Sequence, residues 1–150
     1  MNTRSKIAFW CYISAMAGAG IFGVMFLFRR EFMPYHADAV GMPWSDVPAQ
    51  FQILILALLK LAGGAWLTVA VAALVLLLVP FRHGAPWARW AVPSLGLLHY
   101  AGVSIAMAHV TLNTSASPPW GPTIASVVLI LAGAALSIPA RSKSDAIRPS

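Results

Sequence analysis

The chain has 150 residues, of which 59% are hydrophobic and 9% are charged, and its formal net charge is +6. Soluble domains usually carry about 25% charged residues, so this composition excludes an ordinary soluble protein. The single cysteine excludes an intramolecular disulfide and a redox relay of two cysteines within one chain.

Four long apolar runs, separated by short polar segments, predict four membrane-spanning helices. Each run approaches or exceeds the ~20 helical residues that cross ~30 Å of hydrocarbon. Lipid offers no partner to unpaired backbone groups, and the runs lack the alternation of barrel strands, so helices are the expected spanning element. The predicted spans are 7–28, 51–79, 90–112 and 120–140. We therefore predict an all-α membrane protein with a four-transmembrane-helix bundle over residues 1–140 and a disordered cytoplasmic tail over residues 141–150.

The first run begins like a signal peptide, because Arg4 and Lys6 precede apolar residues and the segment 17–19 offers small residues for cleavage. Its apolar stretch continues through the segment 21–28, which makes it longer than the 7–15 residues of a signal-peptide core. We therefore expect this segment to be retained as the first span.

Basic residues are distributed unequally between the two ends of the predicted bundle. One side has only Arg29 and Arg30, in a connection that also carries three acidic residues. The other side has Arg4, Lys6, Arg82, Arg89, Arg141, Lys143 and Arg148. This bias predicts a multi-pass protein with both termini in the cytoplasm. It also explains the positive net charge, so no nucleic-acid partner is needed to account for that charge. The same basic residues imply contact with anionic lipid headgroups.

Tryptophans flank the predicted spans, as interfacial aromatic side chains do. Trp87 and Trp90 fall at the start of the third span, whereas Trp44 and Trp120 lie toward the opposite surface. Arg89 could stack on a neighbouring indole or hold a lipid phosphate, but membrane anchoring is the simpler interpretation. We predict all five residues to be interface anchors.

The connection from Arg29 to Gln50 combines helix-breaking prolines and glycine with many apolar side chains. Such a loop is expected to lie on the bundle or in the headgroup region rather than to extend freely. We therefore predict a short ordered extracytoplasmic cap between the first two spans. His36 and Asp38 belong to this cap, and they are too few to form a metal site alone.

Lys60 is a charged residue inside the second apolar run, where such groups are costly and warrant a functional hypothesis. In one interpretation, the residues after Lys60 cross the hydrocarbon and its ammonium group reaches the outer interface. In the other, Lys60 faces the bundle interior, because Gly63 and Gly64 share its helix face and small residues mark helix contacts. An inward lysine would need a partner from the cap, with Glu31, Asp38 and Asp46 as candidates.

The third span carries a polar and small-residue stripe. Its members, at spacings of 3, 4, 3 and 4, are His99, Gly102, Ala106, His109 and Asn113. The two histidines are ~15 Å apart along the helix, so they cannot share a metal ion, and no other span supplies histidines for a bis-histidine haem. They either form hydrogen bonds across a helix interface or serve a proton-linked or ligand-binding role.

Small residues also predict where helices pack against one another. These positions are Gly63 and Gly64 in the second span, Gly102 and Ala106 in the third, and Gly133 in the fourth. They indicate either a tight bundle or self-association.

The segment from Lys60 to Leu67 reads KLAGGAWL. It resembles the Gly-Gly-containing second helix of DoxX-like proteins, which are small four-helix bacterial membrane proteins of mostly unknown role. Those proteins often carry an acidic residue where this chain has Lys60. The resemblance implies a location in the bacterial cytoplasmic membrane and suggests association with respiratory or redox enzymes.

Spacing alone locates no nucleophile–base pair, and the sequence contains no nucleotide-binding loop or zinc-spaced cluster, so we predict no catalytic residue, metal or cofactor. Our first hypothesis is a non-catalytic component that self-associates or packs in a larger membrane complex, with membrane lipids and no nucleic acid as partners. The alternative is binding or transport of a small anionic or lipid-like molecule in an outward-facing pocket. The residues expected to line that pocket are Lys60, His99, His109 and Asn113.

Overall fold

The computed structural model describes residues 1–137, which form helices joined by short connections, with no strand among them. Four membrane-length apolar segments are present in this part of the chain. They are α1 (Thr3–Phe28), α3 (Ala49–Leu76) with the π-helical turn that extends it (Leu77–Phe81), α4 (Ala88–Asn113) and α5 (Trp120–Ser137). The predicted four-helix membrane bundle is confirmed. The predicted tail over residues 141–150 and the last three residues of the predicted fourth span lie outside the described residues.

Local sequence explains where these helices begin and end. The side chain of Asn2 caps α1 by accepting a hydrogen bond of 2.9 Å from a backbone N–H of the first turn. Pro80 lacks a backbone N–H, and around it the helix widens so that the Arg82 N–H bonds the Leu77 carbonyl at 3.1 Å. Gly84 then adopts a φ of 77°, which other residues rarely do, and turns the chain toward α4.

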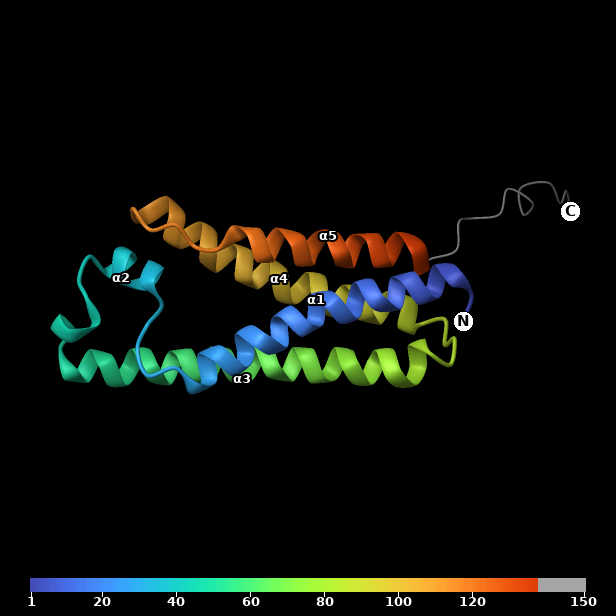
Figure 1. Ribbon diagram of the computed structural model, residues 1–150, viewed down its shortest axis with the longest axis horizontal. Coiled ribbons are helices and arrows are strands. Elements are labelled where there is room, and N and C mark those ends of the chain that lie inside the picture. The colour runs from blue at the N-terminus through green and yellow to red at the C-terminus, as the bar shows by residue number, and fades with distance from the viewer. Residues whose placement is uncertain (138–150) are drawn as a thin grey trace, which may run out of the picture.

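α1 is the central helix of the bundle. It packs along α3 on one side and along α5 on the other, while α4 packs mainly on α5. α3 and α4 approach each other near their connection and diverge toward the opposite end (Figure 1). The Arg4 guanidinium donates a hydrogen bond to the Ala135 carbonyl at 3.4 Å, so the start of α1 and the end of α5 share one end of the molecule. We name this the basic end, because Arg4, Lys6, Arg82 and Arg89 lie there, and the opposite end the cap end.

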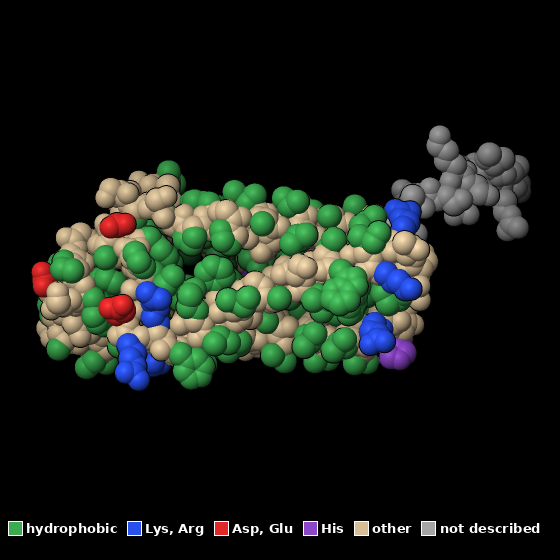
Figure 2. All heavy atoms as spheres, viewed as in Figure 1, with side chains coloured by type: hydrophobic (Ala, Val, Ile, Leu, Met, Phe, Trp, Pro, Cys, Tyr) green, Lys and Arg blue, Asp and Glu red, His purple; other side chains and the backbone are tan. Residues whose placement is uncertain are grey.

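Charged side chains on the surface also gather at the two ends of the bundle. On the face drawn in Figure 2, Lys and Arg side chains gather at the basic end, and charges of both signs gather at the cap end. Hydrophobic side chains cover the length between them. An apolar band between two charged ends is the surface that a membrane-spanning bundle presents to lipid and headgroups.

Two glycines allow helices to approach at backbone distance. A Cβ atom on Gly63 in α3 would lie 2.7 Å from the carbonyl oxygen of Gly23 and 2.7 Å from the amide nitrogen of Leu27, both on α1. A Cβ atom on Gly133 in α5 would lie 2.8 Å from the Tyr12 ring. Larger side chains at these positions would force the helices apart, because the atoms opposite are backbone or a packed ring.

The other predicted packing positions make no close contact with a neighbouring helix. A Cβ atom on Gly64 or Gly102 would meet no atom within 4 Å, and Ala106 is exposed. Within residues 1–137 these positions therefore have open space beside them. A packing role for Gly64 and Gly102 would require a neighbour other than the helices described, and it stays a prediction.

The most tightly packed region lies in the half of the bundle nearer the basic end. The largest fully buried side chains are here, namely Tyr12, Leu77, Val92 and Ile130. The Tyr12 hydroxyl lies 3.2 Å from that of Ser137, so both buried groups have a hydrogen-bond partner inside the bundle. Because lipid tails are as apolar as these side chains, their close fit, rather than escape from water, holds the helices together.

The connection between α1 and α3 forms the predicted ordered cap. It contains a short helix, α2 (Pro34–Val40), followed by a 3₁₀ turn (Trp44–Asp46). Pro34 opens α2, and Gly41 ends it with a φ of 76° while its N–H bonds the Ala37 carbonyl at 2.8 Å. The position of α2 between the diverging ends of α3 and α4 is visible in Figure 1.

The cap is fastened to the bundle by polar and apolar contacts. The side-chain amide of Gln52 in α3 donates to the carbonyls of Trp44 and Val47, both at 3.0 Å. Phe32 and Val47 are buried with side chains from the ends of α1 and α3. The cap is thus a packed part of the fold, which lets its side chains form a wall of the site described below.

Candidate functional site

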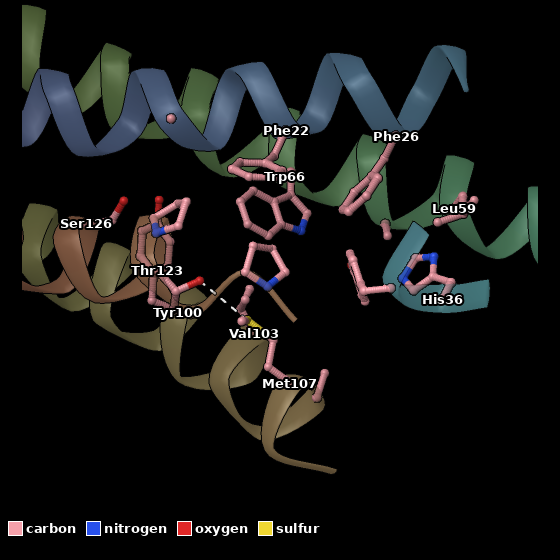
Figure 3. A pocket seen from close by; sticks show the side chains of 16 residues that line it. Phe22, Phe26, His36, Leu59, Trp66, Tyr100, Val103, Met107, Thr123 and Ser126 are labelled. Carbon is pink, nitrogen blue, oxygen red and sulfur yellow. Dashed lines mark hydrogen bonds between the residues drawn. The ribbon is translucent and has the colours of Figure 1, made fainter. Parts of the chain in front are cut away.

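A cavity of about 250 Å³ lies in the cap half of the bundle, between all four membrane-length helices and α2. It forms where α4 and α5 lean away from α3, and α2 covers its outer end (Figures 1 and 3). The cavity is partly open to the surface. Its wall is mainly apolar and includes five aromatic residues other than histidine, which are Phe22, Phe26, Tyr35, Trp66 and Tyr100.

Trp66 is the centre of this aromatic wall. Its ring centroid lies 5.4 Å from that of Phe22 and 6.2 Å from that of Phe26, the latter pair edge to face. On the α4 side the Trp66 ring meets Tyr100 at 6.1 Å and His99 at 4.6 Å, again nearly perpendicular. Such edge-to-face contacts fix ring orientation, so the rings form an ordered wall of the cavity. Figure 3 shows the Trp66 indole between the phenyl rings of α1 and the side chains of α4.

The polar groups of the cavity are few and uncharged. Thr123 and Ser126, both buried, contribute hydroxyls from α5. The Thr123 hydroxyl donates to the Met107 sulfur at 3.4 Å, which is a weak acceptor (Figure 3). The Tyr100 hydroxyl is already engaged, because it donates to the Ala15 carbonyl at 3.1 Å. The hydroxyl of Thr123 could therefore exchange a poor acceptor for a better one on a ligand.

The cap contributes Tyr35 and His36 to the outer end of the cavity. Their rings meet edge to face with 4.1 Å between centroids, and the His36 Nδ1 atom accepts a hydrogen bond of 3.2 Å from the Met33 N–H. Burial lowers the pKa of His36, and the charge of nearby Arg29 lowers it further. Burial also raises the pKa of Tyr35. Both side chains are thus favoured in their neutral forms at the mouth of the cavity.

Lys60 lies outside the cavity wall, on an exposed face of α3. It precedes Gly63 by one helical turn, and Gly63 contacts Leu27, so Lys60 is level with the end of α1. The residues from Lys60 to Phe81 cover ~32 Å of helix, which matches the ~30 Å of hydrocarbon. This placement favours the interpretation in which Lys60 reaches the membrane interface.

The turns of α3 that precede Lys60 project beyond that level. The cap covers one side of them, through contacts to Ile55, Leu56 and Leu59. The opposite side, with Ile53, Leu54 and Leu58, is exposed. The cap is therefore a partial cover for this apolar segment.

The predicted stripe on α4 is divided between two environments. His99 is half-buried against Trp66, and its Nε2 atom is buried with no hydrogen-bond partner among residues 1–137. His109 and Asn113 are exposed, and the Asn113 amide donates to the His109 carbonyl at 2.7 Å. Of the stripe, only Ala106 is among the residues that line the cavity. The structure thus separates Lys60, His99, His109 and Asn113 instead of joining them in one pocket.

The predicted interface anchors lie at both ends of the bundle. At the basic end, Trp87 and Trp90 are exposed and Arg89 is half-buried. Trp44 packs edge to face on Phe32 within the cap, with 4.9 Å between ring centroids. A fifth residue, Trp120 at the start of α5, donates from its indole nitrogen to the Thr111 hydroxyl at 3.3 Å.

The sequence held one signal for the cavity that the predictions did not use. Trp66 and Tyr100 lie well inside their spans, away from the interfaces where such residues usually gather. Aromatic residues at mid-membrane depth indicate packing against something other than headgroups. Phe22, Thr123 and Ser126 carry no comparable signal, because each is an ordinary residue of an apolar helix.

Comparison with models of protein families, with curated proteins and with solved structures finds no match for this chain. The resemblance to DoxX-like proteins rests on the segment from Lys60 to Leu67 and stays a prediction. The site must accordingly be interpreted from its own geometry.

Proposed function

We propose that this multi-pass membrane protein binds a small, mainly apolar, uncharged molecule in the cavity beneath the cap. The observation that carries the proposal is a preformed aromatic cavity to which α1, α2, α3, α4 and α5 all contribute. Concave, mainly apolar sites with a few placed polar groups are the usual form of small-molecule sites. No Lys, Arg, Asp or Glu of residues 1–137 lines this one, which favours a neutral ligand over an anionic one.

Size and polarity narrow the class of ligand. An engineered cavity of ~150 Å³ holds benzene, and drug-sized molecules occupy ~300–1,000 Å³. The observed 250 Å³ accommodates a molecule between these limits, such as a substituted one- or two-ring compound or a short lipid fragment. The Thr123 hydroxyl and the neutral His36 ring would hydrogen-bond a hydroxyl or carbonyl group on it.

The test is native mass spectrometry of the full chain extracted gently from its host membrane, with 1-naphthol added as a probe of suitable shape. Two matched variants of α3 add the same side-chain volume. Ala62→Leu fills the cavity, because Ala62 lines it, whereas Ala65→Leu adds bulk on an exposed face. We expect the wild-type chain and Ala65→Leu to retain a copurified molecule or 1-naphthol, and Ala62→Leu to lose it.

Equal retention by the two variants would show that binding occurs elsewhere, and absence of any bound molecule from the wild-type chain would contradict the proposal. Lys60→Leu distinguishes the neutral ligand from the anionic one expected at Lys60. Because Lys60 lies outside the cavity wall, we expect Lys60→Leu to retain the molecule. Loss of the bound molecule in Lys60→Leu would instead identify Lys60 as a binding residue.

We also propose that the protein resides in the bacterial cytoplasmic membrane with both termini in the cytoplasm. The location derives from the DoxX-like segment, and the orientation derives from the basic residues that gather at one end of the bundle. Fusions of a reporter that is active only in the cytoplasm, placed before Thr3 or within the cap, test the orientation. Activity is expected from the first fusion only.

The second candidate function is a non-catalytic component that self-associates or joins a larger membrane complex. The observation that favours it is the open space at Gly102, on a face of α4 that also exposes His109. Gly102→Leu should then dissociate an oligomer detected by native mass spectrometry. A monomeric wild-type chain without protein partners would argue against this candidate and leave the ligand-binding one standing.

A further inference from the structure

A surface groove runs between α1 and α3 and begins at the basic end, away from the cavity. Its first part has a volume of about 520 Å³. Two exposed cations, Lys6 and Arg82, belong to its wall, and its other lining side chains are apolar. Of these, Phe9, Trp10 and Ile13 come from α1. The groove thus has a charged end at the level of the headgroups and an apolar continuation toward the hydrocarbon.

The groove extends along the same two helices. A second hollow of about 350 Å³ shares Ile13 with the first and reaches Val24 on α1 and Leu67 on α3. Gly20 and Ala70, whose small size keeps the groove open, lie in its wall. Lys6 and Val24 are eighteen residues apart, or ~27 Å along a helix. Since one leaflet contributes ~15 Å of hydrocarbon, the two hollows together are long enough for a complete acyl chain.

Among residues 1–137, the charges near the groove have one sign. The acidic residues of the described chain are Glu31, Asp38 and Asp46. All of them belong to the segment that connects α1 to α3 at the cap end, away from the groove. At the basic end, a polar hollow of about 270 Å³ shares Arg82 with the groove and adds Asn2, Ser5 and Arg89. The charged end of the groove is therefore complementary to an anion that also carries hydrogen-bonding groups.

We propose that this groove binds one anionic phospholipid. The phosphate lies between Lys6 and Arg82, the polar headgroup occupies the hollow beside Arg89, and an acyl chain lies along α1 and α3. Free phosphate would use the two cations but leave the apolar groove empty, whereas a membrane lipid uses both parts. This site is independent of the cavity beneath the cap and of any ligand bound there.

The test is native mass spectrometry of the full chain in detergent with added phosphatidylglycerol or phosphatidylcholine of identical acyl chains. We expect one tightly bound phosphatidylglycerol and weaker binding of phosphatidylcholine. The double variant Lys6→Gln/Arg82→Gln should bind phosphatidylglycerol about 30-fold more weakly, since each cation near a membrane surface contributes roughly fivefold. The matched control, Arg30→Gln/Lys60→Gln, removes two exposed cations at the cap end and should keep the wild-type affinity.

A second variant tests the acyl-chain part of the site. Gly20→Leu fills the groove without a clash, because a Cβ atom there would lie 3.8 Å from that of Ala70. It should lower the affinity for both lipids by a similar factor. Gly64→Leu, outside the groove, should leave both affinities unchanged. Equal affinity for the two lipids, an unchanged double variant, unchanged binding in Gly20→Leu, or displacement of the lipid by equimolar glycerol phosphate would each overturn the proposal.

Discussion

The two halves of the bundle use the same kinds of residues in opposite ways. Near the basic end, a small residue faces a large one. Gly133 lies against the Tyr12 ring, and a Cβ atom on Gly96 would lie 2.8 Å from a methyl group of Ile130. Near the cap end, aromatic residues face aromatic residues across α1, α3 and α4, with Trp66 at the centre. The first arrangement closes the bundle, and the second leaves a cavity.

The comparison shows how a membrane bundle can keep a cavity without losing its fold. In lipid, close packing and hydrogen bonds hold helices together, since the hydrophobic effect does not distinguish a neighbouring helix from an acyl chain. The basic half and the contact between Gly23 and Gly63 supply that packing. The separation in the cap half is confined to α4 and α5, where α2 fills the outer part of the gap.

The largest effect is expected from Gly63→Leu, which tests whether the α1–α3 contact fixes the cap half. Its Cβ atom would meet backbone atoms of α1 at 2.7 Å, and backbone cannot rotate away. We expect a loss of about 3 kcal/mol in the free energy of unfolding, at the upper end of overpacking effects. The measurement is thermal unfolding in detergent by circular dichroism. Gly64→Leu is the control, and it should be neutral or slightly stabilising because it adds a better helix former in open space.

Gly133→Leu should have the next largest effect, because it enters the most tightly packed region. Its Cβ atom would lie 2.8 Å from the Tyr12 ring, which is itself buried and hydrogen-bonded to Ser137. We expect a loss of about 2 kcal/mol, smaller than for Gly63→Leu because a ring can shift more readily than backbone. Gly121→Leu, on the same helix in open space, is the control. Equal melting temperatures for the two variants would contradict the tight packing of the basic half.

The sequence predicted the helices and the cap better than the space between them. Length and hydropathy alone predicted the four spans, and the proline- and glycine-rich connection predicted the cap. Small residues mark possible contacts, but a single sequence cannot tell whether Gly63 or its neighbour Gly64 faces α1. An outward-facing pocket was one of the two functional hypotheses, but its lining was not predicted, because the lining depends on how far α4 leans from α3, which no residue pattern encodes. Polar residues such as Lys60 and His109 drew attention because they are costly in lipid, yet they lie outside its wall.

A pH effect is expected at the cap, where His36 closes the cavity. Burial and then the charge of Arg29 lower its pKa, so the unfolded chain takes up a proton at higher pH than the folded one. The stability of the cap should be full above about pH 6.5 and should fall as the pH drops toward the lowered pKa. Protonation would also remove the acceptor for the Met33 N–H.

Hydrogen exchange of residues 32–47, corrected for intrinsic rates, measures this effect. Exchange should be faster at pH 5.5 than at pH 8 in the wild-type chain, and His36→Gln should remove most of the difference. His83→Gln changes an exposed histidine at the basic end and should keep the difference. A pH response that persists unchanged in His36→Gln would assign it to another group.

The smallest effect on stability is expected from Ala62→Leu, and its smallness is informative. A leucine that should cost about 2 to 3 kcal/mol at Gly133 or Gly63 should be neutral or slightly stabilising at Ala62. The added methyl groups enter the cavity and gain contacts with Phe22 and Trp66, which also line it. A melting temperature within about 2 °C of wild type, combined with loss of the bound molecule, would show that this space is kept open for a ligand. A loss comparable to that of Gly133→Leu would instead show that the cap half is as tightly packed as the basic half.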